Sequence, residues 1–144
     1  MTVFTSGQND EKAGLTISSL VIAEGEPAVL LAVVDPLSRL QEQAIETGRL
    51  VVHVLGADEA RIAGLFAGNY PGDPFEATEY EESEYGPVLV GDRSVVRCRY
   101  LSSEPLGFQG LLRAEIRSIE LADDRHDPLV WYRGRYRRLS PDPD

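Results

Sequence analysis

Apolar and charged side chains alternate strictly in the second half of the chain, and this pattern indicates the fold class. Within residues 94–101, Val96 and Cys98 fall on one face of an extended backbone, and Arg97 and Arg99 fall on the other. A period of two residues is typical of a β-strand with one buried and one solvated face. We therefore predict a long strand here, with Cys98 as an unreactive thiol in the core.

Several other segments have the composition of strands. Residues 110–121 repeat the alternation, and a change of phase near Ile119 predicts a β-bulge. Residues 28–34 are continuously apolar, which is typical of a strand buried on both faces. Aliphatic and β-branched side chains predict further strands at residues 15–21, 49–55, 129–132 and 136–139.

Helical periodicity is confined to short stretches. Apolar residues recur at helical spacing from Leu37 to Ile45, in a helix that should end at Gly48, and a second amphipathic helix should run from Asp58 to Gly68. Helices therefore do not alternate with strands throughout. This order favours a mainly β fold, a mostly antiparallel barrel, over a doubly wound sheet.

The charge balance argues against some classes of partner. The 144 residues include 14 Lys and Arg against 24 Asp and Glu, a formal net charge of −10, which repels phosphate backbones and anionic membrane surfaces. We expect no nucleic-acid partner and no membrane association, since no apolar run approaches the roughly 18 residues that a span requires. The lone cysteine and the missing signal-peptide pattern predict a cytoplasmic protein, folded as a single domain over residues 1–144.

Two segments could contact a nucleotide-like ligand, although the glycine fingerprints of the Rossmann fold and the P-loop are absent. At residues 35–39 a strand gives way to a helix, so backbone amides, the Ser38 hydroxyl and the Arg39 guanidinium could bind an anion. At residues 16–19 the hydroxyl side chains could hydrogen-bond the polar edge of a ring. Taken alone, the first segment is better explained as a helix cap with Asp35 near the N-cap, and the second as an ordinary strand.

The remaining polar residues do not form a recognisable metal or acid–base site. His53 lies in a predicted strand and is interpreted as structural. His126 lies among acidic residues, and this is more typical of a solvated turn than of a metal site because no second histidine stands at ligand spacing. We predict no metal ligand and no catalytic side chain.

The two candidate segments are parts of a longer resemblance. Residues 14–20, the turn that ends at Pro27, the apolar strand to Val34 and the turn at 35–38 with its helix resemble the opening of the flavin-reductase-like family. The similarity covers nearly the whole chain and continues through residues 48–55, 65–67, 86–89 and 129–136. It implies an FMN-binding split barrel, that is, a mainly β fold with an antiparallel split β-barrel and two or more short helices.

The resemblance also implies a cofactor and its contacts. The flavin would be FMN, with FAD as an alternative, and NADH or NADPH would be the co-substrate. Relatives typically hold the isoalloxazine on the hydroxyl-rich strand and the phosphate at the turn between strand and helix. The residues implied here are, for the ring, Thr16, Ile17, Ser18 and Ser19, and for the phosphate, Asp35, Leu37 and Ser38, with Arg39 as a compensating cation.

The implied protein is an NAD(P)H-dependent flavin oxidoreductase, a homodimer with flavin at the subunit interface and a possible monooxygenase partner. Two departures keep alternatives open. Phe108-Gln109 stands where family reductases often carry an Asp-His pair, which suggests a flavin-binding or carrier protein without reductase turnover. Asp35-Pro36 replaces the Asn-Arg of many relatives, which leaves open a split-barrel homologue that binds another ligand.

Overall fold

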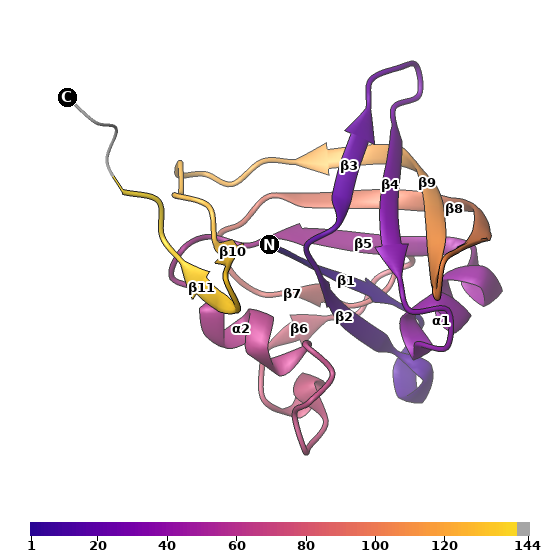
Figure 1. Cartoon of the computed structure of the whole chain (residues 1–144). Coiled ribbons are helices and arrows are strands. Elements are labelled where there is room, and N and C mark those ends of the chain that lie inside the picture. The colour runs from indigo at the N-terminus through magenta and orange to yellow at the C-terminus, as the bar shows by residue number, and fades with distance from the viewer. Residues whose placement is uncertain (141–144) are drawn as a thin grey trace.

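The computed structural model describes residues 1–140, and its main feature is one antiparallel sheet that curls on itself (Figure 1). The strands follow the order β2-β1-β5-β8-β9-β4-β3, and every neighbouring pair is antiparallel. Their bounds are β1 Thr2–Ser6, β2 Ala13–Ile17, β3 Leu20–Ala23, β4 Val29–Val34, β5 Arg49–Val54, β8 Val95–Leu106 and β9 Gln109–Glu120. The predicted fold class, a mainly β antiparallel barrel, is confirmed.

The barrel is split between β2 and β3. These two strands form opposite edges of the sheet, yet only Ser18 and Ser19 separate them in the chain. The sheet therefore curls until its edges approach each other, and β2 lies against β4 without pairing with it. The edge of the barrel thus places the hydroxyl-bearing segment beside the strand that leads into the turn at residue 35.

Short elements cover the sheet. Helix α1 (Arg39–Thr47) packs against β1 and β2, and helix α2 (Ala60–Leu65) follows β5. Residues 69–86, between α2 and β7, contain a 3-10 turn and a short strand. The remaining elements are the 3-10 helices η1 (Asn9–Glu11) and η2 (Pro74–Glu76), the pair β6 (Tyr80–Glu81) and β7 (Val88–Leu89), and the pair β10 (Val130–Tyr132) and β11 (Arg135–Arg137).

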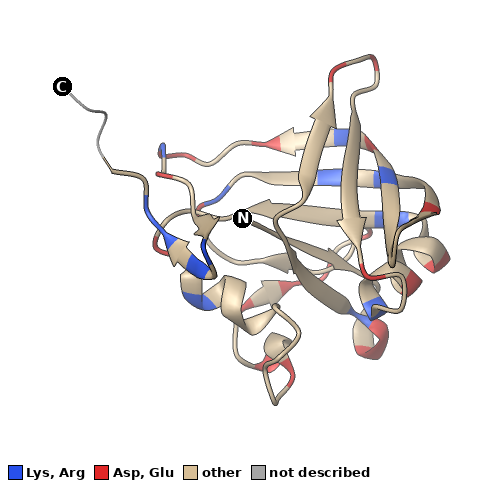
Figure 2. Cartoon of the chain, viewed as in Figure 1, with Lys and Arg blue, Asp and Glu red and all other residues tan. Residues whose placement is uncertain are grey.

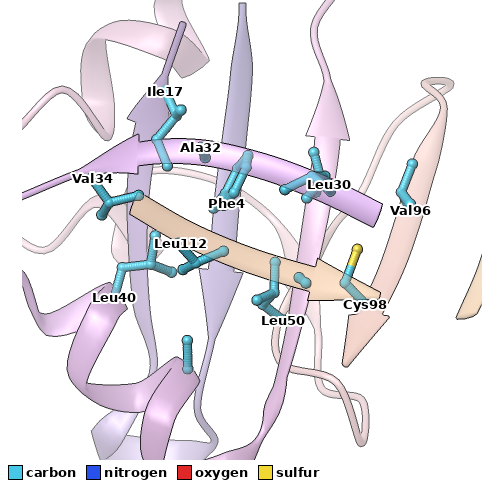
Figure 3. Close-up of a cluster of buried hydrophobic side chains, with 13 residues drawn as sticks. Phe4, Ile17, Leu30, Ala32, Val34, Leu40, Leu50, Val96, Cys98 and Leu112 are labelled. Carbon is cyan, nitrogen blue, oxygen red and sulfur yellow. The ribbon is translucent and has the colours of Figure 1, made fainter. Parts of the chain in front are cut away.

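The core consists of two apolar clusters on the two faces of β1 and β5. Phe4 and Leu50 point into the barrel, where they meet Leu30 and Leu112 (Figure 3). Val3 faces the other way, into a cluster with Leu55, Phe66, Phe75 and Leu129. Because successive side chains of a strand point to opposite faces, β1 and β5 are buried on both.

The alternating strands behave as expected. Val96 and Cys98 are buried, while Arg97 and Arg99 face outward. The register passes from Arg97 opposite Ser118 to Cys98 opposite Ile116, so the bulge lies at Arg117, two residues before the change of phase at Ile119.

The outward-facing arginines of β8 and β9 pair with acids. Glu115 accepts from Arg99 at 2.6 Å and from Arg117 at 2.8 Å, and these bonds hold its pKa below the usual value. Arg113 pairs with Glu104 at 2.7 Å. Figure 2 shows this mixture of basic and acidic segments on the strands. The outward face of β8 and β9 therefore carries a series of ion pairs.

Three details of the sequence-based interpretation were wrong. The strand expected at 15–21 is divided at Ser18. β4 is fully buried on one face only, because its outer side chains, such as Leu31, remain partly exposed. The apolar stripe expected from Leu37 to Ile45 faces the core only in its middle. Its end residues, Leu37 and Ile45, are 91% and 54% exposed.

No helix among residues 1–140 is both long enough and apolar enough to cross a membrane.

Candidate functional site

The turn after β4 is organised by its own side chains. The Asp35 carboxylate accepts the N–H of Leu37 at 2.9 Å, and the Ser38 hydroxyl accepts the N–H of Gln41 at 3.2 Å. Ser38, rather than Asp35, is therefore the N-cap of α1. Among residues 1–140 the amides of Arg39 and Leu40 have no acceptor, as is usual in the first turn of a helix.

Beside this helix start lies a cavity of about 360 Å³. Ser38 and Arg39 line one side of it, and Gly14 and Leu15 of β2 line another. Lys12 completes the cationic groups, although Arg39 is also paired with Glu11 at 3.2 Å. Two cations and free helix amides suit a phosphate. Asp10 and Asp73 also line the cavity, and their carboxylates would repel a phosphate.

Gly14 is required at this place by close packing. A Cβ on Gly14 would stand 2.6 Å from the ring of Phe66, so any larger residue would displace that ring. The backbone of β2 thereby approaches the aromatic cluster closely, and the Thr16 amide donates to the Phe66 carbonyl at 2.8 Å. These two contacts hold Gly14 and Thr16 against Phe66.

The four residues implied for the ring differ in what they can offer. The Thr16 hydroxyl donates to the Ala63 carbonyl at 2.6 Å, and the Ser19 hydroxyl exchanges two hydrogen bonds with the backbone of Val33. Ile17 is buried in the barrel core and lines neither cavity, and its carbonyl accepts the Thr2 hydroxyl at 2.6 Å. Ser18 is exposed.

Thr16 and Ser18 line a second cavity, of about 160 Å³, together with aromatic residues of the β10–β11 hairpin. Trp131 and Tyr136 stand opposite each other across that hairpin, with ring centroids 4.8 Å apart. Trp131 is half-exposed. Hydroxyl groups next to an exposed aromatic face form a suitable wall for a flat polar ring.

The two cavities follow each other along β2. Leu15 lines the first and Ser18 the second, and three residues of extended chain span roughly 10 Å. The structure therefore brings Ser38 and Arg39 beside β2, the strand that carries Thr16 and leads to Ser18. Asp35 and Leu37 line neither cavity.

Sequence reasoning missed the contribution of Lys12, Trp131 and Tyr136. Lys12 is the only lysine of the chain, and its ammonium lies 5.7 Å from the centroid of the Phe75 ring. Nothing in its local sequence indicates that it shares a cavity with Arg39. The single tryptophan, Trp131, was a better indication of a ligand-contacting residue than Lys12, because large aromatic residues that remain exposed often contact ligands.

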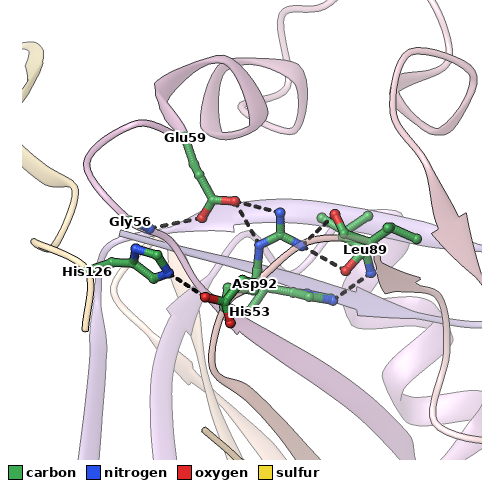
Figure 4. A network of polar contacts seen from close by, with 8 residues as sticks. His53, Gly56, Glu59, Leu89, Asp92 and His126 are labelled. Carbon is green, nitrogen blue, oxygen red and sulfur yellow. Dashed lines mark hydrogen bonds and ion pairs between the residues drawn. The ribbon is translucent and has the colours of Figure 1, made fainter. Parts of the chain in front are cut away.

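The two histidines belong to structural contacts, shown in Figure 4. His53 is fully buried; its Nδ1 lies 3.0 Å from the Val3 carbonyl, and its Nε2 accepts the N–H of Leu89 at 3.0 Å. Burial lowers its pKa to about 4, so the ring is neutral. His126 lies 2.9 Å from Asp92, and that hydrogen bond raises the pKa of the imidazole.

Neither histidine nor the cysteine forms a reactive centre. Cys98 is fully buried, and burial raises the pKa of its thiol to about 12. In the part of the chain that the structure describes, no three His, Cys, Asp or Glu side chains are grouped closely enough to hold a metal ion. The walls along β2 can bind and orient a ligand through charges and hydrogen bonds.

The fold occurs in solved structures of flavin reductases. The NADH:FAD oxidoreductase SgcE6 of Streptomyces globisporus superposes with a TM-score of 0.87 at 22% sequence identity, over 99% of this chain and 81% of that one. The curved sheet with its split edge is thus the split-barrel fold of these proteins. The chain belongs to the family of the flavin reductase like domain, whose sequence pattern matches residues 1–140.

Two curated relatives are similar over almost the whole chain. The reductase subunit HsaB of a flavin-dependent monooxygenase from Mycobacterium tuberculosis is 26% identical over 144 residues, which are 99% of this chain and 76% of that protein. The NADH-dependent FMN reductase AsuE2 of Streptomyces nodosus subsp. asukaensis is 27% identical over 147 residues, which cover 97% of this chain and 78% of AsuE2.

Proposed function

We propose that the chain is a flavin reductase that binds FMN along β2 and uses NADH or NADPH to reduce it. The observation that carries the proposal is the pair of cavities along β2 and Ser18, one cationic at Lys12 and Arg39 and one aromatic at Trp131. A phosphate at one end and a flat ring at the other are the two chemical ends of FMN. FAD carries the same groups and is the alternative cofactor.

Each wall has a distinct task in this proposal. Arg39, Lys12 and the first amides of α1 hold the phosphate. Thr16 and Ser18 present hydrogen-bonding groups to the ring edge. Trp131 covers the ring and excludes water from it. A bound flavin would supply a ring that accepts hydride from a reduced nicotinamide, so the protein contributes position and electrostatics.

We also propose a homodimer and a monooxygenase partner. The edge strand β3 supports the dimer, because Val21 and Ile22 lie on opposite faces of it and are 61% and 49% exposed. A second subunit that covers this edge would complete the wall near Ser18. The relatives HsaB and a 4-hydroxyphenylacetate 3-monooxygenase reductase component are named as parts of monooxygenases, which supports reduced flavin as the product that is passed on.

The test is a flavin titration followed by a turnover assay. Purified protein is titrated with FMN while the visible spectrum is recorded, and NADH or NADPH is then added with and without flavin. We expect a shifted flavin spectrum and flavin-dependent oxidation of the nicotinamide. No binding of FMN, FAD or riboflavin, together with no oxidation, would refute the proposal.

A carrier without turnover is the second candidate, and Phe108 favours it. Phe108 and Gln109 stand at the tip of the β8–β9 hairpin and offer no group that changes charge near neutral pH. The same assay separates the two functions: the carrier binds FMN and leaves NADH and NADPH unoxidised.

A further inference from the structure

The β10–β11 hairpin has a second face, which none of the functions proposed above uses. Trp131 and Tyr132 stand in successive cross-strand pairs, the latter opposite Arg135. Successive pairs of a hairpin point to opposite faces, so Trp131 faces the ring cavity while Tyr132, Arg135 and Arg137 face away from it. The guanidinium of Arg133, in the turn, lies 5.3 Å from the centroid of the Tyr132 ring. The outer face is therefore three arginines around one tyrosine.

This basic face is exposed and unneutralised by its surroundings. Its three arginines are exposed, and none forms an ion pair with another of residues 1–140. The chain from residue 129 onward has four arginines against two acids, whereas the whole protein has a net charge of −10 (Figure 2). Arginine and tyrosine are enriched at the centres of protein interfaces. The face therefore suits an acidic protein surface.

The turn between β3 and β4 has the complementary charge. Residues 24–27 include Glu24 and Glu26, and they project beyond the last hydrogen bond to β9, which the Ala28 carbonyl accepts from Ile116 at 3.0 Å (Figure 1). All four residues of the turn are exposed. Within residues 1–140 neither glutamate has a cationic partner. The turn therefore presents two carboxylates outward.

Strand β3 connects these two surfaces in a symmetric dimer. β3 is at the edge of the sheet, and a two-fold axis makes the pairing of two identical edges antiparallel. The start of one strand then lies beside the end of the other. β3 starts at Leu20, two residues after Ser18, which shares the ring cavity with Trp131 of the hairpin. The end of the partner's β3, which leads into the acidic turn, therefore approaches the hairpin.

We propose that each subunit of the dimer places its β3–β4 turn against the basic face of the partner's β10–β11 hairpin, so that the two glutamates meet the three arginines. The inference rests on the proposed homodimer, whose contact surfaces it specifies. Two-fold symmetry forms the contact twice. Because the inner face of the hairpin lines the ring cavity, each subunit holds the aromatic wall of its partner's site in place. The glutamates and arginines are positioning residues.

The experiment reverses the charge of each surface in turn. The turn variant combines Glu24→Arg with Glu26→Arg, and the hairpin variant combines Arg133→Glu with Arg135→Glu. All four positions are exposed, so we expect both variants to fold, and circular dichroism checks this. The dissociation constant of the dimer is measured by analytical ultracentrifugation, and the same samples are titrated with FMN.

The matched control reverses another exposed acidic pair. Glu81→Arg with Glu82→Arg makes the same change of charge as the turn variant, on the segment around β6. It therefore separates a specific contact from the effect of net charge on association.

We expect the dissociation constant to rise about a hundredfold in the turn variant and in the hairpin variant, because like charges then face each other, and to stay unchanged in the control. An equimolar mixture of the two variants should dimerise as tightly as wild type, since both contacts of the mixed dimer again join opposite charges. FMN affinity should fall in each variant alone and recover in the mixture.

Unchanged dimerisation in both variants would overturn the contact, and so would a mixture that stays monomeric. An equal loss in the control would overturn it as well, because the effect would then be one of net charge. A monomeric wild type would overturn the proposed homodimer and the contact with it. A dimeric wild type that neither binds flavin nor oxidises NADH would instead overturn the reductase function alone.

Discussion

Arg93 and Glu59 form an ion pair in which two nitrogens of one guanidinium donate to the same carboxylate oxygen, at 3.0 Å and 2.5 Å. The Arg93 side chain is 3% exposed and also donates to the Leu89 carbonyl at 2.7 Å. The other Glu59 oxygen accepts the N–H of Gly56 (Figure 4). This pair therefore joins the segment after β7 to the segment before α2.

Replacing Arg93 with Met should lower the free energy of unfolding by about 3 kcal/mol, because the carboxylate of Glu59 would lose its partner in a largely buried place. Urea unfolding at neutral pH measures this. Arg97→Met is the control: its ion pair with Glu120 is exposed, and such pairs contribute about 0–1 kcal/mol. Equal losses in both variants would contradict the interpretation.

His53 should make the protein less stable as the pH falls. The pKa of the buried ring is about 4, below the ordinary 6.5 of the unfolded chain, so between these values the unfolded state binds more protons. The stability contributed by the neutral ring is complete above pH 6.5 and is lost toward pH 4, by at most about 1.4 kcal/mol per pH unit.

The measurement is urea unfolding at a series of pH values in wild type and His53→Asn. We expect a less steep dependence in the variant, together with lower stability at neutral pH, since Val3 and Leu89 lose their partner. His126→Gln is the control of opposite sign, because its raised pKa stabilises the fold at low pH. If the free energy of unfolding depends on pH as steeply in His53→Asn as in wild type, groups other than His53 determine that dependence.

Cys98 should resist thiol reagents in the native protein. Its side chain is fully buried, and a pKa of about 12 leaves almost no thiolate at pH 8. Titration with a disulfide reagent should therefore detect no thiol until urea unfolds the chain. Rapid labelling of folded protein would show that β8 opens locally.

Lys12→Gln and Arg39→Gln should each weaken FMN binding about tenfold, the size of one charge-assisted hydrogen bond. Riboflavin, which has no phosphate, should bind both variants as well as it binds wild type. Arg61→Gln serves as the control, since Arg61 lies on α2 and donates to the Ala77 carbonyl. Equal losses for FMN and riboflavin would place the phosphate elsewhere.

Flavin binding should quench the fluorescence of Trp131, the single tryptophan of the chain. Trp131 lines the cavity that Thr16 and Ser18 share, so a ring bound there would contact the indole and accept its excitation energy. The titration is repeated with Trp131→Phe, which should still bind FMN, more weakly, when followed by the flavin spectrum. Flavin binding without a change in tryptophan emission would show that the flavin ring does not bind beside Trp131.

The amino-acid sequence by itself determined the local structure where a pattern depends on near neighbours. Strand alternation at Val96 and Cys98 follows from the period of the backbone, and the end of α1 at Gly48 follows from a left-handed φ of 73° that glycine adopts without strain. The bulge in β9 was predicted to within two residues because it changes the phase of the two-residue alternation. Ser38 and Arg39 could be recognised because a helix start has a local signature.

Only the tertiary structure decided which of these segments meet. Lys12, Arg39 and Gly14 share one cavity, and Trp131 shares another with Thr16, although more than a hundred residues separate the last two. The curling of the sheet, which brings β2 to β4, creates these contacts, and no local period encodes them. Burial likewise depends on the whole fold, and for this reason Leu37 is exposed and Gln41 is buried.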